Sequence, residues 1–196
     1  LENIRYASPD EAVAVAEQHR DVIIGIKVRL GYQMVGERAL PALRLARQAA
    51  DRLDLPMMVH IVDLPQPLQE ILPLMRGGDV ATHCFHGERY GILDSAGRVL
   101  PEVREAAARG VTFDVGHGVG SFSFETARRA LADGMLPDTI SSDLHAHNID
   151  GPVFDLATTL SKFLHLGLSL DEVITRATVT PARAIRWEGR IGTLAP

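Results

Sequence analysis

The sequence has little that could cross-link the chain, anchor it in a membrane or attract a polyanion. Cys84 is its single cysteine, so no disulfide forms within the chain and a reducing compartment, the cytoplasm, is expected. No run approaches the roughly 18 apolar residues that cross a bilayer, and no leader-like segment opens the chain. The 20 basic residues are dispersed among 25 acidic ones, without a basic stretch suited to nucleic acid. A small-molecule partner is therefore expected, with homo-oligomerisation left open.

The composition is that of a globular protein. The 196 residues are 46% hydrophobic and 23% charged, which predicts one domain with a sizeable core. Short apolar runs alternate with helical patterns along the whole chain, so the fold class expected is α/β with a parallel sheet. Strands are predicted at 22–28, 56–62, 79–84, 111–115 and 139–143, and helices at 9–20, 38–53, 68–75, 99–109, 122–133, 153–166 and 169–177.

The predicted strands end near Lys27, His60, His83, Asp114 and Asp143. These ends follow one another at roughly the 30-residue interval of a βα unit, so five such units are expected. A closed (β/α)₈ barrel needs eight units and about 250 residues, so length alone favours an open sheet. The side chains at the strand ends favour the barrel.

Four of these strand ends carry groups that can bind a metal ion or a substrate: Lys27, His60, His83 and Asp143. Reactive side chains of α/β proteins collect at the carboxyl ends of the strands. A lone histidine there is usually a hydrogen-bonded structural residue, but two histidines with an aspartate suit Zn²⁺, Mn²⁺ or Fe²⁺. The sequence therefore predicts one metal site shared by these residues.

Lys27 has three interpretations. Burial disfavours its charged form, and a neutral amine can add CO₂ to give a carbamate that bridges two metal ions. Alternatively, Lys27 forms the Schiff base of an aldolase or lyase barrel. In the third interpretation its ammonium simply extends into solvent. The two histidines and Asp143 favour the carbamate, because an aldolase does not require them.

Three further residues are candidates for substrate binding. Arg29 lies on the same strand face as Lys27, where its guanidinium could clamp a carboxylate or form a surface ion pair. His117 lies in the glycine-rich segment 116–120, and His145 follows Asp143. For both histidines a plain loop role is the alternative.

Several strings, in this order, resemble the amidohydrolase superfamily, and specifically its dihydroorotase-like amidohydrolase/deacetylase group with a carboxylated lysine. The strings are GIKVRL, LPMMVHI, GDVATHCFHG, GVTFDVGHGVGSFSF, LPDTISSDLH and ATVTPARAI, and the closing GRIGTLAP resembles that group's exit from the barrel. The resemblance covers essentially the whole chain. It implies that residues 1–196 are the C-terminal part of one TIM-type barrel domain, with strands four to eight, and that the N-terminal strands and a small β-domain lie outside.

The resemblance also implies roles for the four strand-end residues. Lys27 would be the carbamate bridging two divalent ions, zinc first among them; His60 and His83 would bind the second ion. Asp143 would bind the first ion and act as the base on a metal-activated water. The implied reaction is hydrolysis of an amide, cyclic amide or ester bond of a small metabolite, as by a deacetylase or dihydroorotase.

One feature of this group has no counterpart in the sequence. The group's first strand carries a His-x-His pair that completes the first metal site, and we do not assign His145-Ala146-His147 to that role because it follows Asp143. A catalytically incomplete barrel fragment that binds a ligand or a partner through open sheet edges is therefore a further alternative.

Overall fold

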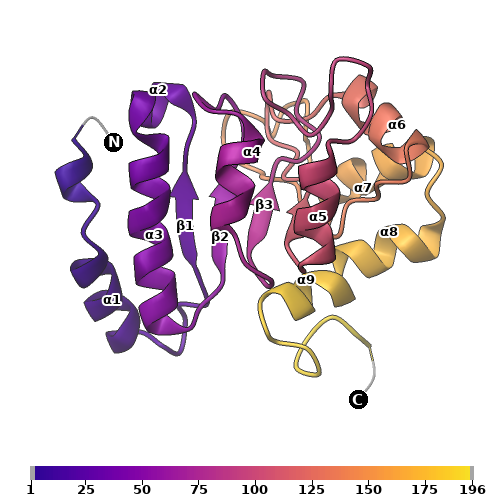
Figure 1. The fold of residues 1–196 in the computed structure, drawn as a ribbon. Coiled ribbons are helices and arrows are strands. Elements are labelled where there is room, and N and C mark those ends of the chain that lie inside the picture. Colours follow the sequence, from indigo (N-terminus) through magenta and orange to yellow (C-terminus); the bar gives the residue numbers. More distant parts are fainter. Residues whose placement is uncertain (1–2, 195–196) are drawn as a thin grey trace.

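The computed structural model describes residues 3–194, built around a parallel sheet of four strands (Figure 1). The strands are β1 (Ile26–Arg29), β2 (Met57–His60), β3 (Val80–Thr82) and β4 (Thr112–Asp114), and they neighbour one another in sequence order. The helices are α1 (Pro9–Gln18), α2 (Tyr32–Val35), α3 (Ala39–Leu53), α4 (Leu68–Ile71), α5 (Pro101–Ala108), α6 (Phe124–Ala132), α7 (Leu156–His165), α8 (Leu170–Ala177) and α9 (Val179–Ala184), with short 3₁₀ turns at η1 (Ile4–Tyr6), η2 (Gly36–Arg38) and η3 (Leu72–Leu74). This order confirms the α/β prediction and forms part of a barrel.

The strand register separates the sheet into an apolar and a polar face. One row across the sheet pairs Val28, Val59, Ala81 and Phe113, all of them buried. The adjacent row pairs Arg29, His60, Thr82 and Asp114. Because successive side chains of a strand point to opposite faces, these two rows lie on opposite sides of the sheet.

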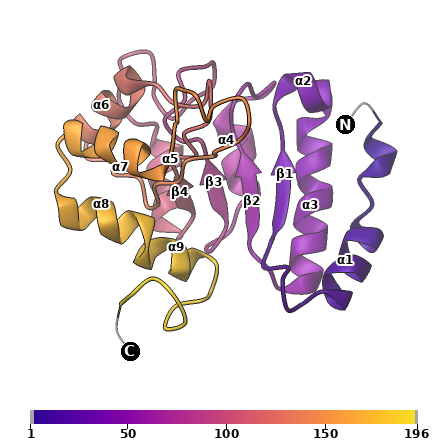
Figure 2. The same ribbon diagram turned by 180° about the vertical axis from the view of Figure 1, so that it is seen from behind.

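Helices cover the apolar face of the sheet, and the polar face of β1 and β2 is left without one. α3, α4 and α5 lie in front of the sheet in Figure 1, and α1 packs outside α3. Seen from behind, β1 and β2 have no helix in front of them (Figure 2). The small residues Ala42 and Ala50 and the fully buried Leu43 let α3 approach the sheet closely. The polar face is therefore the inner face of the partial barrel.

The first strand is shorter than predicted. It begins only at Ile26, and Val22 is 67% exposed. The amides of Val22 and Ile23 both donate to the carbonyl of His19, so a turn at the end of α1 uses the groups that a strand would offer its neighbour. The prediction of a strand over 22–28 was therefore wrong for its first half. The strand propensity of the β-branched residues there is outweighed by the turn that ends α1.

The fifth predicted strand, 139–143, is reduced to one bridge between Thr139 and Asp114. The segment nevertheless runs beside β4, since the amides of Val115, His117 and Gly118 donate to its carbonyls. Gly116 has a φ of 46°, and this left-handed residue interrupts the regular ladder. Four strands and one irregular segment thus replace the five strands expected.

Asp114 holds the irregular segment against the sheet. Its buried carboxylate accepts hydrogen bonds from Thr82 (2.6 Å), Thr139 (2.6 Å) and Ser141 (2.8 Å). These bonds join β3, β4 and the 139–143 segment beneath the loops that follow them.

No helix within residues 3–194 is long and apolar enough to span a membrane. The last two residues of the GRIGTLAP string, 195 and 196, lie outside the described residues.

Candidate active site

The four predicted strand-end residues line one cavity of about 560 Å³. Lys27 comes from β1, His60 ends β2, His83 directly follows β3, and Asp143 ends the irregular segment beside β4. The other lining residues are Arg29, Val119, Gly120, Ser121, His145 and His147. Side chains from four separate segments thus meet on the inner face. His60, His83 and Asp143 lie at the carboxyl ends of their segments, whereas Lys27, predicted at a strand end, is the second residue of β1, which continues to Arg29.

The rings of His60 and His83 face each other edge-on, with centroids 4.4 Å apart and an angle of 71° between the planes. Nδ1 of His83 lies 2.6 Å from the carbonyl oxygen of Gly116. A carbonyl only accepts, so Nδ1 carries the hydrogen and Nε2 of the neutral ring keeps its lone pair. Such a backbone contact on one ring nitrogen is how proteins orient a metal-binding histidine.

Both histidines are held in the neutral form. Burial, followed by the neighbouring His83, lowers the pKa of His60 to about 3. Burial also lowers the pKa of His83, against an opposing effect of the hydrogen bond to Gly116. Because a metal ion binds neutral imidazole, both rings are ready to act as ligands at neutral pH.

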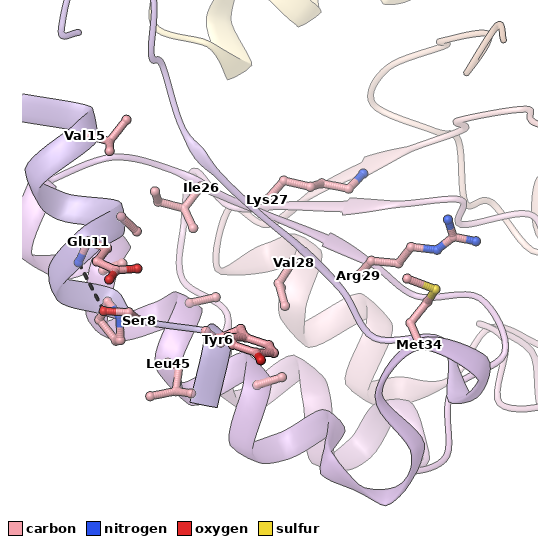
Figure 3. A pocket seen from close by; sticks show the side chains of 16 residues that line it. Tyr6, Ser8, Glu11, Val15, Ile26, Lys27, Val28, Arg29, Met34 and Leu45 are labelled. Atoms are coloured by element: carbon pink, nitrogen blue, oxygen red, sulfur yellow. Dashed lines mark hydrogen bonds between the residues drawn. The ribbon is translucent and has the colours of Figure 1, made fainter. Parts of the chain in front are cut away.

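Lys27 and Arg29 leave β1 on one side, and Ile26 and Val28 on the other (Figure 3). Nζ of Lys27 lies 3.3 Å from the sulfur of Met58. Burial lowers the pKa of Lys27, while the carboxylates of Asp143 and Asp114 oppose this shift. The lowered pKa makes the free amine, the form that reacts with CO₂ or a carbonyl, more accessible. Arg29 forms no ion pair with any acid among residues 3–194.

Two of the four residues have a left-handed backbone, which is uncommon for a residue other than glycine. The φ angles are 74° at His83 and 47° at Asp143. Such strain persists only where the surroundings hold it in place, and it is concentrated at functional sites. Here the side-chain amide of the buried Asn148 donates to the carbonyl of Asp143 (2.9 Å).

Glycines let the 116–120 loop pass directly against the site. A Cβ on Gly116 would lie 2.7 Å from Nδ1 of His83, and one on Gly118 would lie 3.0 Å from Oδ2 of Asp143. Both glycines also have positive φ. In this structure the glycine-rich segment therefore allows close backbone approach to two site residues.

Of the three predicted substrate-binding residues, two line the cavity and one does not. Arg29 and His145 line the same cavity as the four main residues. His117 instead is buried behind the loop, with its Nε2 2.8 Å from Nζ of Lys162. Cys84 is fully buried, and burial raises the pKa of its thiol well above its usual range.

A second cavity, of about 520 Å³, lies along β1, between that strand, α3 and the segment around Tyr6, and Lys27 and Arg29 also line it (Figure 3). Its walls are largely apolar, including Val15, Ile26, Val28 and Leu45. No histidine lines it, so the chemistry is assigned to the first cavity.

His86 belongs to the surroundings of the site and was not predicted from sequence. It is 1% exposed, its Nδ1 accepts from the amide of Glu88 (3.1 Å), and its Nε2 has no hydrogen-bond partner among the described residues. Burial, followed by the neighbouring His83, lowers its pKa to about 4. The sequence signal was only its spacing three residues after His83.

The lowered pKa of His86 predicts that the folded protein becomes less stable in acid. Between about pH 6.5 and 4 the unfolded chain binds a proton at His86 that the folded chain excludes, so stability falls as the pH falls. His86→Asn should flatten this dependence by up to about 1.4 kcal/mol per pH unit. Urea unfolding at several pH values, with a chelator present, measures it, and His165→Asn on α7 is the control. An unchanged slope in His86→Asn would show that His86 accepts the proton in the folded state.

The metal-binding potential of the described residues is partial. Among residues 3–194, no three histidine, cysteine, aspartate or glutamate side chains are grouped closely enough to hold a metal ion. The donor set of the cavity nevertheless fits a divalent ion chemically, since it offers two adjacent neutral imidazoles with a carboxylate and an amine nearby.

Curated relatives match nearly the whole chain but only part of their own length. No protein-family model matches the sequence. A deacetylase of Enterococcus faecalis is 42% identical over 165 residues, which are 83% of this chain and 45% of that protein. A deacetylase of Agrobacterium fabrum is 36% identical over 188 residues, 96% of this chain and 46% of that protein. The chain spans about half the length of the curated relatives it matches.

Two solved structures have the same architecture. An adenine deaminase superposes with a TM-score of 0.94 at 37% identity, covering 100% of this chain and 54% of that one. A dihydroorotase superposes with a TM-score of 0.89 at 36% identity, covering 98% of this chain and 54% of that one. The fold and the sequence thus point to the same group of proteins.

Proposed function

The chain belongs to the amidohydrolase superfamily, and from this we propose that it forms part of a metal-dependent hydrolase that cleaves the acyl bond of an amide, cyclic amide or ester in a small metabolite. One observation carries the proposal: Lys27, His60, His83 and Asp143 line a single cavity on the inner face of the sheet. The names of the relatives, deacetylase and dihydroorotase, favour an acyl C–N or C–O bond.

In this proposal residues 1–196 are the C-terminal part of one barrel domain. His60 and His83 would hold a divalent ion through their neutral rings, and Lys27, as a carbamate, and Asp143 would supply further oxygen ligands for the metal centre. The ions, when bound, lower the pKa of water and polarise the scissile carbonyl. Ligands that the described residues do not supply come from the half of the relatives' length that this chain does not cover.

Asp143 is the proposed proton carrier. Its side chain lines the cavity, and Asn148 holds its main chain. It accepts the proton of the attacking water and delivers it to the nitrogen or oxygen of the leaving group, as a general base and then a general acid.

Arg29 and His145 are the proposed substrate contacts. The guanidinium of Arg29 is without an acidic partner among the described residues, and it lies beside His60 in the strand register. A planar guanidinium binds a carboxylate through two parallel hydrogen bonds. A substrate with a carboxylate close to its acyl bond therefore suits this cavity best.

The test uses the full-length natural protein with a panel of N-acetyl and O-acetyl carboxylates and cyclic amides. We expect hydrolysis of at least one class, loss of activity on chelation, and recovery with Zn²⁺ that improves when bicarbonate is added. Hydrolysis that survives complete metal removal would contradict the proposal. Borohydride trapping of a substrate on Lys27 would support the aldolase alternative instead.

A further inference from the structure

Lys162 on α7 is one of only two lysines in the sequence, and both lie next to the candidate site. Its ammonium donates to the carbonyl of Pro152 (2.7 Å) and lies 2.8 Å from Nε2 of His117. It forms no ion pair with an acid in the part of the chain that the structure describes. The ammonium of Lys162 therefore donates hydrogen bonds to two loops and not to a carboxylate.

The partners of His117 determine which ring nitrogen accepts a hydrogen bond and which donates one. An ammonium has donors only, so Nε2 of His117 must accept the bond from Lys162. Nδ1 then carries the hydrogen and donates to the carbonyl of Gly118, 2.9 Å away. The ring also stacks on Phe122, with centroids 4.6 Å apart. Burial and the charge of Lys162 both lower the pKa of His117, so the ring stays neutral.

This chain of contacts ends at Asp143. The amides of His117 and Gly118 donate to the carbonyls of Ser141 and Ser142 (3.0 and 3.1 Å), directly before Asp143. Gly118 approaches the Asp143 carboxylate so closely that an added Cβ would lie 3.0 Å from Oδ2. The residue whose ring Lys162 contacts is therefore adjacent in the chain to the glycine that meets the proposed proton carrier.

The second bond of Lys162 reaches the other side of the same residue. Pro152 lies in the loop that leads from Asp143 into α7, shown in orange in Figure 2. The segment 145–148 of that loop is closed by the amide of His145, which donates to the side chain of Asn148 (2.8 Å). Lys162 therefore joins two loops next to Asp143: the 116–120 loop, which contacts its carboxylate side, and the loop that follows Asp143 in the chain.

We propose that Lys162 is a positioning residue of the active site, which acts through His117 and Gly118 to hold the loop backbone against Asp143. The inference rests on the proposed function for its kinetic consequence, but its structural part does not depend on any activity. Lys162 itself does not line the cavity and is not proposed to touch substrate.

The structural part is tested on the full-length protein labelled with ¹⁵N-histidine. Two-bond ¹⁵N–¹H spectra should show His117 as the Nδ1–H tautomer, which is the less common form of a free neutral histidine. In Lys162→Met the carbonyl of Gly118 still holds the hydrogen on Nδ1, so the tautomer should persist, but the ¹⁵N shift of Nε2 should move because its hydrogen bond from Lys162 is lost. In Lys162→Arg, which keeps the donors, the Nε2 shift should stay close to that of the unchanged protein. An Nε2–H ring at His117 in the unchanged protein would overturn the proposal, whether or not the protein hydrolyses acyl bonds.

The kinetic part compares kcat and KM. Since small misplacements of reacting groups can cost up to about 100-fold in rate, Lys162→Met should lower kcat by about tenfold or more and leave KM within about twofold. His117→Phe should act similarly, and the double variant should be no worse than the poorer single variant, because both residues act in one chain of contacts. Lys162→Arg should recover most of kcat.

The control is Arg98→Met, which removes an exposed cation that forms an ion pair with Asp94 and does not line the cavity, and it should leave kcat unchanged. Circular dichroism and thermal unfolding confirm that each variant is folded, and Lys162→Arg provides the comparison if Lys162→Met is not. An unchanged kcat in Lys162→Met, a loss confined to KM, or additive losses in the double variant would each overturn the positioning role.

Discussion

Replacing Asp143 with Asn in the full-length protein is expected to lower kcat by about 10²- to 10⁴-fold, the range typical of a general acid–base group. An amide has nearly the shape of the carboxylate but cannot take up the proton of the attacking water. Because an amide oxygen can still coordinate a metal ion weakly, part of the bound metal should remain. Steady-state kinetics, together with the metal content of the purified variant, measure both effects.

Asp150→Asn is the matched control, since Asp150 lies in the same loop region but does not line the cavity. It should retain normal turnover. Near-normal kcat in Asp143→Asn would rule out Asp143 as the proton carrier, whatever the metal content.

His60→Ala and His83→Ala are each expected to lower the bound metal and the activity by at least about 100-fold. Their rings meet at 4.4 Å in the cavity, and His83 is oriented by the carbonyl of Gly116. Removing either ring takes one nitrogen ligand away and leaves the other ring without its neighbour. Metal content by mass spectrometry and hydrolysis of the best panel substrate provide the two readouts.

His19→Ala is the control for these variants, because His19 follows the end of α1 outside the cavity and is exposed. It should keep full metal content and activity. Full metal content in both His60→Ala and His83→Ala would exclude the histidine pair as ligands.

The sequence predicted the strand-end residues of the cavity well. Alternation of strands and helices located β2, β3 and β4 to within a few residues, and the rule that reactive groups follow parallel strands placed Lys27, His60 and His83 in one cavity. Such predictions succeed because they depend on local periodicity and on a general property of parallel sheets.

The parts that failed depend on competing backbone hydrogen bonds and on a break in the neighbouring strand, which hydrophobic periodicity does not encode. The β-branched Val22 and Ile23 have strand propensity, yet their amides close a turn on His19. The 139–143 segment keeps one bridge to the sheet, because the positive φ of Gly116 interrupts the extended conformation of the backbone beside it. No local pattern reveals these competing hydrogen bonds.

The supporting residues of the site were also hidden in the sequence. Asp114 was noted only as a strand end, although its carboxylate binds three hydroxyl groups from two other segments. His117 was predicted as a substrate contact, whereas the structure places it against Lys162, a residue 45 positions along the chain. Contact of His117 with substrate stays a prediction that this geometry does not favour.

The most direct test of the site assignment is anomalous X-ray diffraction at the zinc edge from crystals of the full-length protein grown with Zn²⁺ and bicarbonate. We expect a peak about 2.1 Å from the ring nitrogens of His60 and His83, with density for a carbamate on Lys27 beside it. A peak bound elsewhere, with these two rings free of metal, would contradict the assignment of this cavity as the metal-dependent active site.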